Sequence, residues 1–252
     1  MNAHVWLAHR ESAHESCLSA TELVRRNRYQ QEEDRQRFTT GATLARFALR
    51  HRTYDAEADI ARRCPDCAGV DHGPLSAAGP HADAWSLSVS HSGDLVAVAI
   101  VPGDRPVGID VEVADLATID RIKPLLCGEQ EYAEDEAADD RHHALLTRWV
   151  RKEAILKAAK VGLSVPMRHL RVSPAGRPAQ LLSWNPDSVP DGLDPGHVAC
   201  RDVPQEALAA VDARSRGAVA VVDTRMITLD LHWVGAELSD IRANAPELAA
   251  AC

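Results

Sequence analysis

Apolar residues recur at helical spacing in two segments of the chain. The first runs over about residues 22–50 and predicts a helix with one face toward a core and Arg37, Arg46 and Arg50 near its polar side. The residues of the apolar face are Phe38, Ala42, Ala45 and Leu49. The second pattern runs over about residues 128–159, in two helical pieces separated by the acidic stretch EDEAADD.

The second of these pieces, HALLTRWVRKEAILKAAK, contains a charge in an apolar stripe. Its apolar side chains at helical spacing are Leu145, Trp149, Leu156 and Ala159. Lys152 falls on the same stripe, and a break in a local pattern is where a functional constraint is expected. Glu153 and Lys157 lie four residues apart and share a helix face, which a surface ion pair would also explain.

Three strands are predicted in WSLSVSHSGDLVAVAIVPGDRPVGIDVE, because turn-rich SHSGD and PGDRP separate alternating or apolar runs. The simplest arrangement is an antiparallel meander, which would bring Ser90, His91, Asp110 and Glu112 to one sheet edge. Further strands are expected at HVACRDV and GAVAVV, with a surface loop at NPDSVPDGLDPG. The likeness of DLVAVAIV to GAVAVVDT suits a duplicated α/β unit.

Asp110 and Glu112, in VGIDVE, are two carboxylates on the same face of a predicted strand. Like charges so close repel each other, so the pair predicts a positive species between them. Mg²⁺ prefers oxygen ligands and commonly takes one or two carboxylates together with substrate phosphates. The alternative is a solvated strand end with two unrelated acids.

Composition limits the function further. The chain has 252 residues, 45% of them hydrophobic, which suffices for one large or two small α/β cores. The formal net charge of −9 argues against binding to nucleic acid or to an anionic membrane. With no secretory signal pattern at its start and no apolar run long enough to span a bilayer, the chain is expected to be cytoplasmic. Its six cysteines are therefore expected to be thiols.

Two other clusters invite a chemical interpretation. Ser90 and His91 end a strand at a tight turn, where the imidazole could bind phosphate or serve only the fold. Cys64, Cys67 and His72 resemble the start of a zinc site, but closed structural sites use four ligands. His51 or His81 would have to complete it, so an irregular loop is favoured there.

The motifs SVSHSG, VGIDVE, WVRKEAILKA and GLSVP occur in this order over at least residues 37–166. In order and spacing the chain closely resembles the Sfp-type 4′-phosphopantetheinyl transferases. The resemblance implies transfer of the phosphopantetheine arm of coenzyme A to a serine of an acyl or peptidyl carrier protein, with release of adenosine 3′,5′-bisphosphate. It also implies a monomer of two similar α/β subdomains in a pseudo-twofold arrangement, with coenzyme A in the cleft between them. We expect the subdomains at residues 1–105 and 106–252.

The resemblance also implies roles for individual residues. Asp110, Glu112 and Glu153 match the family's magnesium-binding acids, and Lys157 matches its pyrophosphate-contacting lysine. Glu153 is the expected general base for the carrier serine. The expected contacts to coenzyme A phosphates are Ser90, His91 and Arg37, with Arg25, Arg28 and Arg46 as further candidates. Glu131 matches a recurring acidic position and is expected to act behind the metal ligands.

The chain departs from the family in one place. Relatives often carry a lysine in a pattern like HGKP, whereas this chain has HGPL at residues 72–75. An arginine elsewhere could supply that cation. Two other classes of function stay open: a coenzyme A-binding regulator without catalysis, and a zinc-organised interaction module around Cys64, Cys67 and His72. The carrier and its pathway are not readable from the sequence.

Overall fold

The structure, a computed structural model, describes residues 1–62, 67, 69, 73–81, 83–113, 116–235 and 238. The chain is of the mixed α/β class, as expected, and divides into two compact units. The N-terminal unit comprises His4–Asp104 and the described residues from Asp230 on, and the C-terminal unit comprises Met1–Ala3 and Arg105–Leu229. The residues from 230 on therefore lie with the first part of the chain, whereas the expected division placed them with the second. They do so because strand β11 (Thr228–Val234) joins the sheet that contains strand β1 (Asn2–His9).

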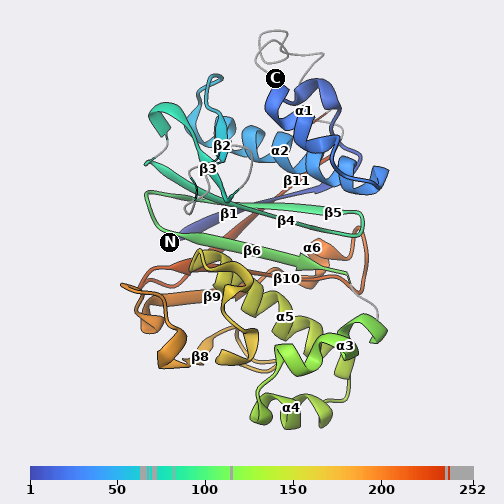
Figure 1. Ribbon diagram of the computed structural model, residues 1–252, viewed down its shortest axis with the longest axis vertical. Helices are drawn as coiled ribbons and strands as arrows, with labels where there is room; N and C mark the ends of the chain where they lie inside the picture. The colour runs from blue at the N-terminus through green and yellow to red at the C-terminus, as the bar shows by residue number, and fades with distance from the viewer. Residues whose placement is uncertain are drawn as a thin grey trace. The chain divides into compact units, whose positions relative to one another are not determined.

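The N-terminal unit is built on a four-stranded sheet with the order β11-β1-β5-β4. Strand β5 (Leu95–Pro102) pairs antiparallel with β1 on one side and with β4 (Trp85–Ser92) on the other. Seven consecutive residues of β5 are buried, and it is an inner strand of this sheet. Helix α2 (Glu32–Thr53) contacts β4 and β5 in this unit (Figure 1). The smaller elements are α1 (Ala20–Arg26), β2 (Ile60–Arg62), β3 (Leu75–Ala77) and 3-10 helices at Glu15–Cys17 and Gly79–His81.

The single helix expected over residues 22–50 is two helices, since α1 ends at Arg26 and α2 begins at Glu32. Asn27 caps the first helix and the chain turns before the second. The predicted apolar face of α2 is confirmed, because Phe38, Ala42, Ala45 and Leu49 are all buried. The placement of Arg46 near the polar side was wrong, because its side chain is buried too.

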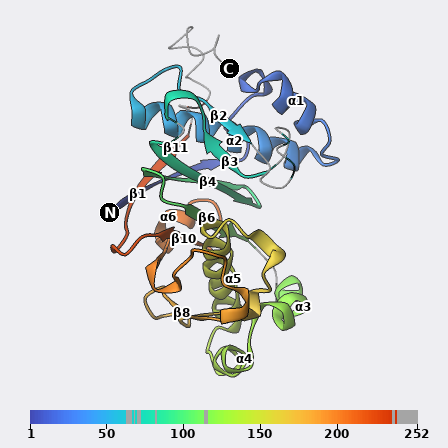
Figure 2. The same cartoon turned by 60° about the vertical axis from the view of Figure 1, so that its left-hand side comes forward.

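The C-terminal unit is built on a three-stranded antiparallel sheet with the order β6-β10-β9. These strands are β6 (Val107–Glu112), β9 (Val198–Asp202) and β10 (Arg216–Val222). Helix α5 (Arg141–Ala158) runs alongside β6 and β10, as both views show (Figures 1 and 2). The other elements are α3 (Leu116–Leu126), α4 (Glu129–Glu136), β7 (Leu170–Val172), β8 (Leu181–Trp184), α6 (Gln205–Leu208) and 3-10 helices at Gly162–Ser164, Met167–His169, Pro186–Ser188 and Pro195–His197.

The predicted three-stranded meander was wrong in its third strand. β4 and β5 form the expected hairpin, but β6 pairs with β10 in the other unit's sheet. The segment PGDRP is longer than a tight hairpin turn, and after it Pro106 accepts a backbone hydrogen bond from Val222, next to β10. The two remaining predicted strands correspond to β9 and β10. Over the described residues, none of the helices is both long and apolar enough to cross a bilayer.

Candidate active site

Strand β6 lies directly against the backbone of helix α5, and Gly108 makes this approach possible. A Cβ atom at Gly108 would lie 2.1 Å from the Ala154 carbonyl oxygen and 2.5 Å from the Ala158 nitrogen. Only glycine fits such a contact. Because alternate residues share one face of a strand, Asp110 and Glu112 lie on the same face as Gly108 and therefore toward α5.

The buried carboxylate of Asp110, which is 2% exposed, contacts the end of helix α5. Lys157 donates a hydrogen bond from Nζ to Asp110 Oδ1 at 2.7 Å and to the Ile109 carbonyl at 3.2 Å. Burial and the charge of Asp110 both raise the pKa of Glu153, while Lys157 opposes them. The structure thus brings Asp110, Glu153 and Lys157 together from β6 and α5, whereas a surface pair on α5 would involve that helix alone.

Glu112 completes what we call the acid–lysine cluster: Asp110, Glu112, Glu153 and Lys157. Glu112 is half-buried at the end of β6, on the strand face that it shares with Asp110. Three carboxylates offer the oxygen donors that Mg²⁺ prefers, and their combined negative charge exceeds what one ammonium group neutralises. The chemistry of the donor set therefore suits a magnesium ion, although the three carboxylates do not lie within 4.8 Å of one another in this structure.

Arg37, Ser90 and His91 form a second group, in the N-terminal unit. Ser90 and His91 lie near the end of β4, directly before the turn into β5. Arg37 reaches this turn from α2, donating from Nε to the Gly93 carbonyl at 2.7 Å, while its Nη1 lies 2.5 Å from Asp34 Oδ1. Ser90 is buried and His91 exposed. The structure thus places Arg37 beside the hairpin turn that follows Ser90 and His91.

The other candidate arginines differ in their surroundings. Arg46 is buried, and its guanidinium donates to Glu22 at 3.0 Å and to Asp59 at 2.6 Å. Although burial alone would lower it, these two carboxylates raise the pKa of Arg46. Arg46 therefore forms buried ion pairs within the N-terminal unit. Arg25 lies over the Phe38 ring, 5.7 Å from its centroid, and Arg28 is exposed.

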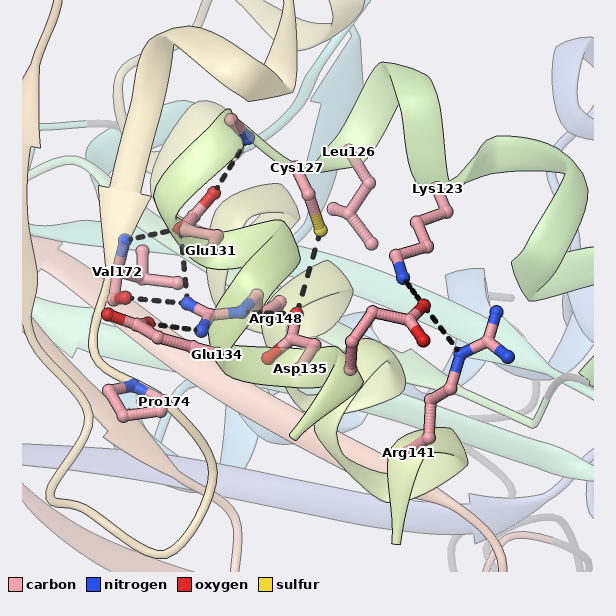
Figure 3. Close-up of polar contacts among 12 residues, drawn as sticks. Lys123, Leu126, Cys127, Glu131, Glu134, Asp135, Arg141, Arg148, Val172 and Pro174 are labelled. Carbon is pink, nitrogen blue, oxygen red and sulfur yellow. Dashed lines mark hydrogen bonds and ion pairs between the residues drawn. The ribbon is translucent and has the colours of Figure 1, made fainter. Parts of the chain in front are cut away.

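A buried ionic network lies behind α5, between this helix and α4 (Figure 3). Arg148, which is 0% exposed, donates from Nε to Asp135 at 2.6 Å and from Nη2 to Glu134 at 2.6 Å. Its Nη1 donates to the Val172 carbonyl at 2.9 Å and to Glu131 at 3.2 Å. A fully buried guanidinium is tolerated because its donors are satisfied in this way.

Lys152 belongs to the same network. Its Nζ donates to Glu131 Oε2 at 2.5 Å and to the Leu126 carbonyl at 2.7 Å. Burial lowers the pKa of Lys152, and the charge of Glu131 acts in the opposite direction. The charge in the apolar stripe is thus explained by Glu131, which also accepts from the backbone nitrogens of Gly128 and Val172. This contact fixes the side of α5 next to Glu153 against α4.

Sequence reasoning missed two of the buried cations of α5. Arg148 is described above, and Arg151 forms a two-pronged ion pair with Asp202 on β9, at 2.8 and 2.5 Å. Arg148 lies three residues before Arg151 and four before Lys152, so it is a neighbour of both on one side of the helix. Three cations at helical spacing opposite the acid-rich helix α4 and strand β9 are the signal that could have identified them.

The zinc hypothesis lies mostly outside the described residues, since Cys64 and His72 are not among them. Cys67 is exposed. Of the two residues considered as a fourth ligand, His81 contacts Asp55 at 2.7 Å and His51 packs edge-on against Trp6. The HGPL departure begins at the same undescribed His72.

Residues 106–196 match the family model of the 4′-phosphopantetheinyl transferase superfamily. The matched segment contains the whole acid–lysine cluster and the buried network of α4 and α5. The match supports the superfamily that the motifs implied, at the level of phosphopantetheinyl transfer in general. No curated protein matches the chain.

Proposed function

We propose that this protein is an Sfp-type 4′-phosphopantetheinyl transferase. It transfers the phosphopantetheine arm of coenzyme A to a serine of an acyl or peptidyl carrier protein, with Mg²⁺, and releases adenosine 3′,5′-bisphosphate. The observation that carries the proposal is the acid–lysine cluster: within the segment that matches the superfamily, β6 and α5 bring Asp110, Glu153 and Lys157 together.

Lys157 is the residue proposed to bind the pyrophosphate. Its ammonium group forms an ion pair with Asp110 and remains partly exposed to solvent. An ammonium group held there attracts the pyrophosphate and stabilises the negative charge that grows on its oxygens during transfer. Asp110 positions Lys157 through the 2.7 Å hydrogen bond.

Glu153 is the proposed general base. In the metal-free protein, burial and the charge of Asp110 raise the pKa of Glu153, and a carboxylate with a raised pKa is a stronger proton acceptor. As the serine oxygen bonds to the β-phosphorus, the bond from that phosphorus to the bridging oxygen breaks and its electron pair leaves with adenosine 3′,5′-bisphosphate. The serine proton passes to Glu153.

Asp110, Glu112 and Glu153 are the residues that would hold Mg²⁺. When bound there, the ion would neutralise pyrophosphate charge and relieve the repulsion among the three carboxylates. The need for magnesium belongs to the proposal and is tested by titrating the ion into chelator-treated enzyme.

Ser90, His91 and Arg37 are proposed to contact the other phosphate groups of coenzyme A. Their support is the geometry at the β4–β5 turn, where Arg37 is anchored by the Gly93 carbonyl. Arg25 and Arg28 stay as weaker candidates. Arg46 has less support than the others, because Glu22 and Asp59 already occupy its guanidinium.

The direct experiment incubates the protein with coenzyme A, Mg²⁺ and unmodified carriers of the fatty-acid, polyketide and nonribosomal-peptide classes. Intact-mass measurement should show the phosphopantetheine mass added to the serine of at least one carrier. Binding of coenzyme A without any mass gain would favour the non-catalytic regulator instead.

A further inference from the structure

A second cluster of potential metal ligands lies in the N-terminal unit, apart from the acid–lysine cluster. His4 on β1 and Asp230 and His232 on β11 form it, and among the described residues they are the one group of this kind whose ligand atoms lie within 4.8 Å of one another. β1 and β11 are neighbours in the sheet (Figure 1). Residues from near the two ends of the sequence thus meet at one point.

Asp230 lies within ion-pair distance of both imidazoles, and one metal ion could bind all three side chains. Asp230 Oδ2 lies 3.0 Å from His4 Nδ1 and 3.4 Å from His232 Nε2. Ligand atoms held at about 2.0–2.2 Å from a tetrahedral zinc ion lie roughly 3.3–3.5 Å apart. The separation between His232 and Asp230 matches that of a zinc coordination shell, and the separation between His4 and Asp230 is a few tenths of an ångström shorter.

The hydrogen-bonding of the two imidazole nitrogens also favours a metal. His4 Nδ1 and His232 Nε2 are both buried, and neither forms a hydrogen bond of good geometry, although Asp230 lies within ion-pair distance of each. The His4 residue is only 7% exposed, so bulk solvent does not surround this nitrogen. A buried nitrogen without a hydrogen bond costs free energy unless something else binds it.

Neighbouring rings hold the two imidazoles in place. His232 stacks on Trp6 with ring centroids 4.2 Å apart, and His4 stacks on His232 at 5.8 Å. Trp6 is fixed in turn by Phe47 of α2, edge-on at 5.3 Å. This packing orients both nitrogens toward Asp230 before any metal binds, which lowers the cost of ordering the site.

We propose that His4, Asp230 and His232 bind a divalent transition metal of the zinc type, which fastens β11 to β1. Two imidazoles and one carboxylate are borderline ligands that suit zinc and exclude magnesium, which demands oxygen. The half-exposed Asp230 leaves room for water as a fourth ligand. This site is independent of the transferase activity, because no residue is shared with the acid–lysine cluster.

The test uses the full chain without a histidine tag, stripped by a chelator and titrated with ZnCl₂ in a calorimeter. One zinc ion should bind per chain and raise the temperature of unfolding, whereas MgCl₂ should not compete. Asp230→Asn and His232→Gln should each weaken binding by at least about tenfold and remove the thermal shift. Circular dichroism of the metal-free variants verifies that they fold.

Cys67→Ser is the matched control, because it would remove a ligand of the alternative cysteine site. Zinc binding should be unchanged in it, and Co²⁺ bound to the wild type should show visible bands without a thiolate charge-transfer band. The proposal is overturned if the wild type binds no zinc, if both cluster variants bind it as tightly as the wild type, or if Cys67→Ser abolishes binding.

Discussion

At the residue scale, Lys157 is proposed to bind coenzyme A and also to speed the transfer. Lys157→Ala removes the ammonium group that we propose for the pyrophosphate, so it should weaken coenzyme A binding and slow transfer together, each on the order of tenfold or more. Calorimetric titration with coenzyme A beside single-turnover transfer measures both effects. Lys160→Ala, a change to an exposed lysine just after the same helix, is the control and should alter neither. Unimpaired binding in Lys157→Ala would remove the pyrophosphate contact.

Glu153 gives a separate prediction about rate. Glu153→Gln cannot accept the serine proton but keeps an oxygen, so coenzyme A should bind at comparable affinity while transfer falls by on the order of 10²–10⁴. Single-turnover transfer measures the rate and calorimetry the affinity. If transfer is unimpaired, Glu153 is not the base.

The same residue predicts a dependence of stability on pH in metal-free protein. Burial and Asp110 raise the folded-state pKa of Glu153, so the folded state holds its proton to higher pH than the unfolded state does. The wild type should therefore lose stability as pH rises from the ordinary carboxyl range to the raised value. Glu153→Gln avoids this loss and should be the more stable protein at neutral pH, with the difference shrinking in acid. Denaturant unfolding at several pH values checks this, and an unchanged difference across pH would contradict it.

At the scale of elements, the approach of β6 to α5 positions the acid–lysine cluster. Gly108→Ala would place a Cβ atom 2.1 Å from the Ala154 carbonyl oxygen, so the strand and helix must separate. We expect a loss of about 1–3 kcal/mol in the free energy of unfolding and a fall in transfer rate. Gly235→Ala, where an added Cβ meets nothing within 4 Å, is the control for denaturant unfolding. Equal stability of the two variants would show that β6 does not need the glycine.

The contact between α4 and α5 depends on buried charges. Lys152→Met leaves Glu131 without its ammonium partner, so it should destabilise the fold by about 3–5 kcal/mol. The folded fraction should still bind coenzyme A, because Lys152 serves the packing of α5. Denaturant unfolding measures the loss of stability, and calorimetry measures the affinity for coenzyme A. A stable Lys152→Met that no longer binds coenzyme A would instead make this lysine a ligand contact.

Sequence patterns predicted the elements near the acid–lysine cluster well. In VGIDVE and KEAILK the local sequence is enough to predict which side chains share a face, because strand alternation and helical spacing determine it. The patterns failed where a partner is distant in sequence. Nothing local showed that β6 would pair with β10 rather than β5, or that Arg46 would be buried against Glu22 and Asp59.

At the scale of the whole molecule, the strands near the two ends of the chain are the feature that sequence patterns predicted least well. Neither β1 nor β11 was predicted, and only their pairing brings His4 to Asp230 and His232. The mixed α/β class, in contrast, followed from alternating and helical patterns distributed over the whole chain. Long-range pairing is set by the total burial that it allows, which short windows of sequence do not contain.

The central claim is that the acid–lysine cluster transfers phosphopantetheine, and intact-mass analysis of a carrier protein tests it most directly. Wild-type protein with coenzyme A and Mg²⁺ should add one phosphopantetheine to the carrier serine, and Asp110→Ala should add none although circular dichroism shows it folded. Removing Asp110 takes away both a proposed metal ligand and the anchor of Lys157. The account is contradicted if no carrier of the three classes gains mass with the wild type, or if Asp110→Ala modifies the carrier at a near-normal rate throughout a magnesium titration.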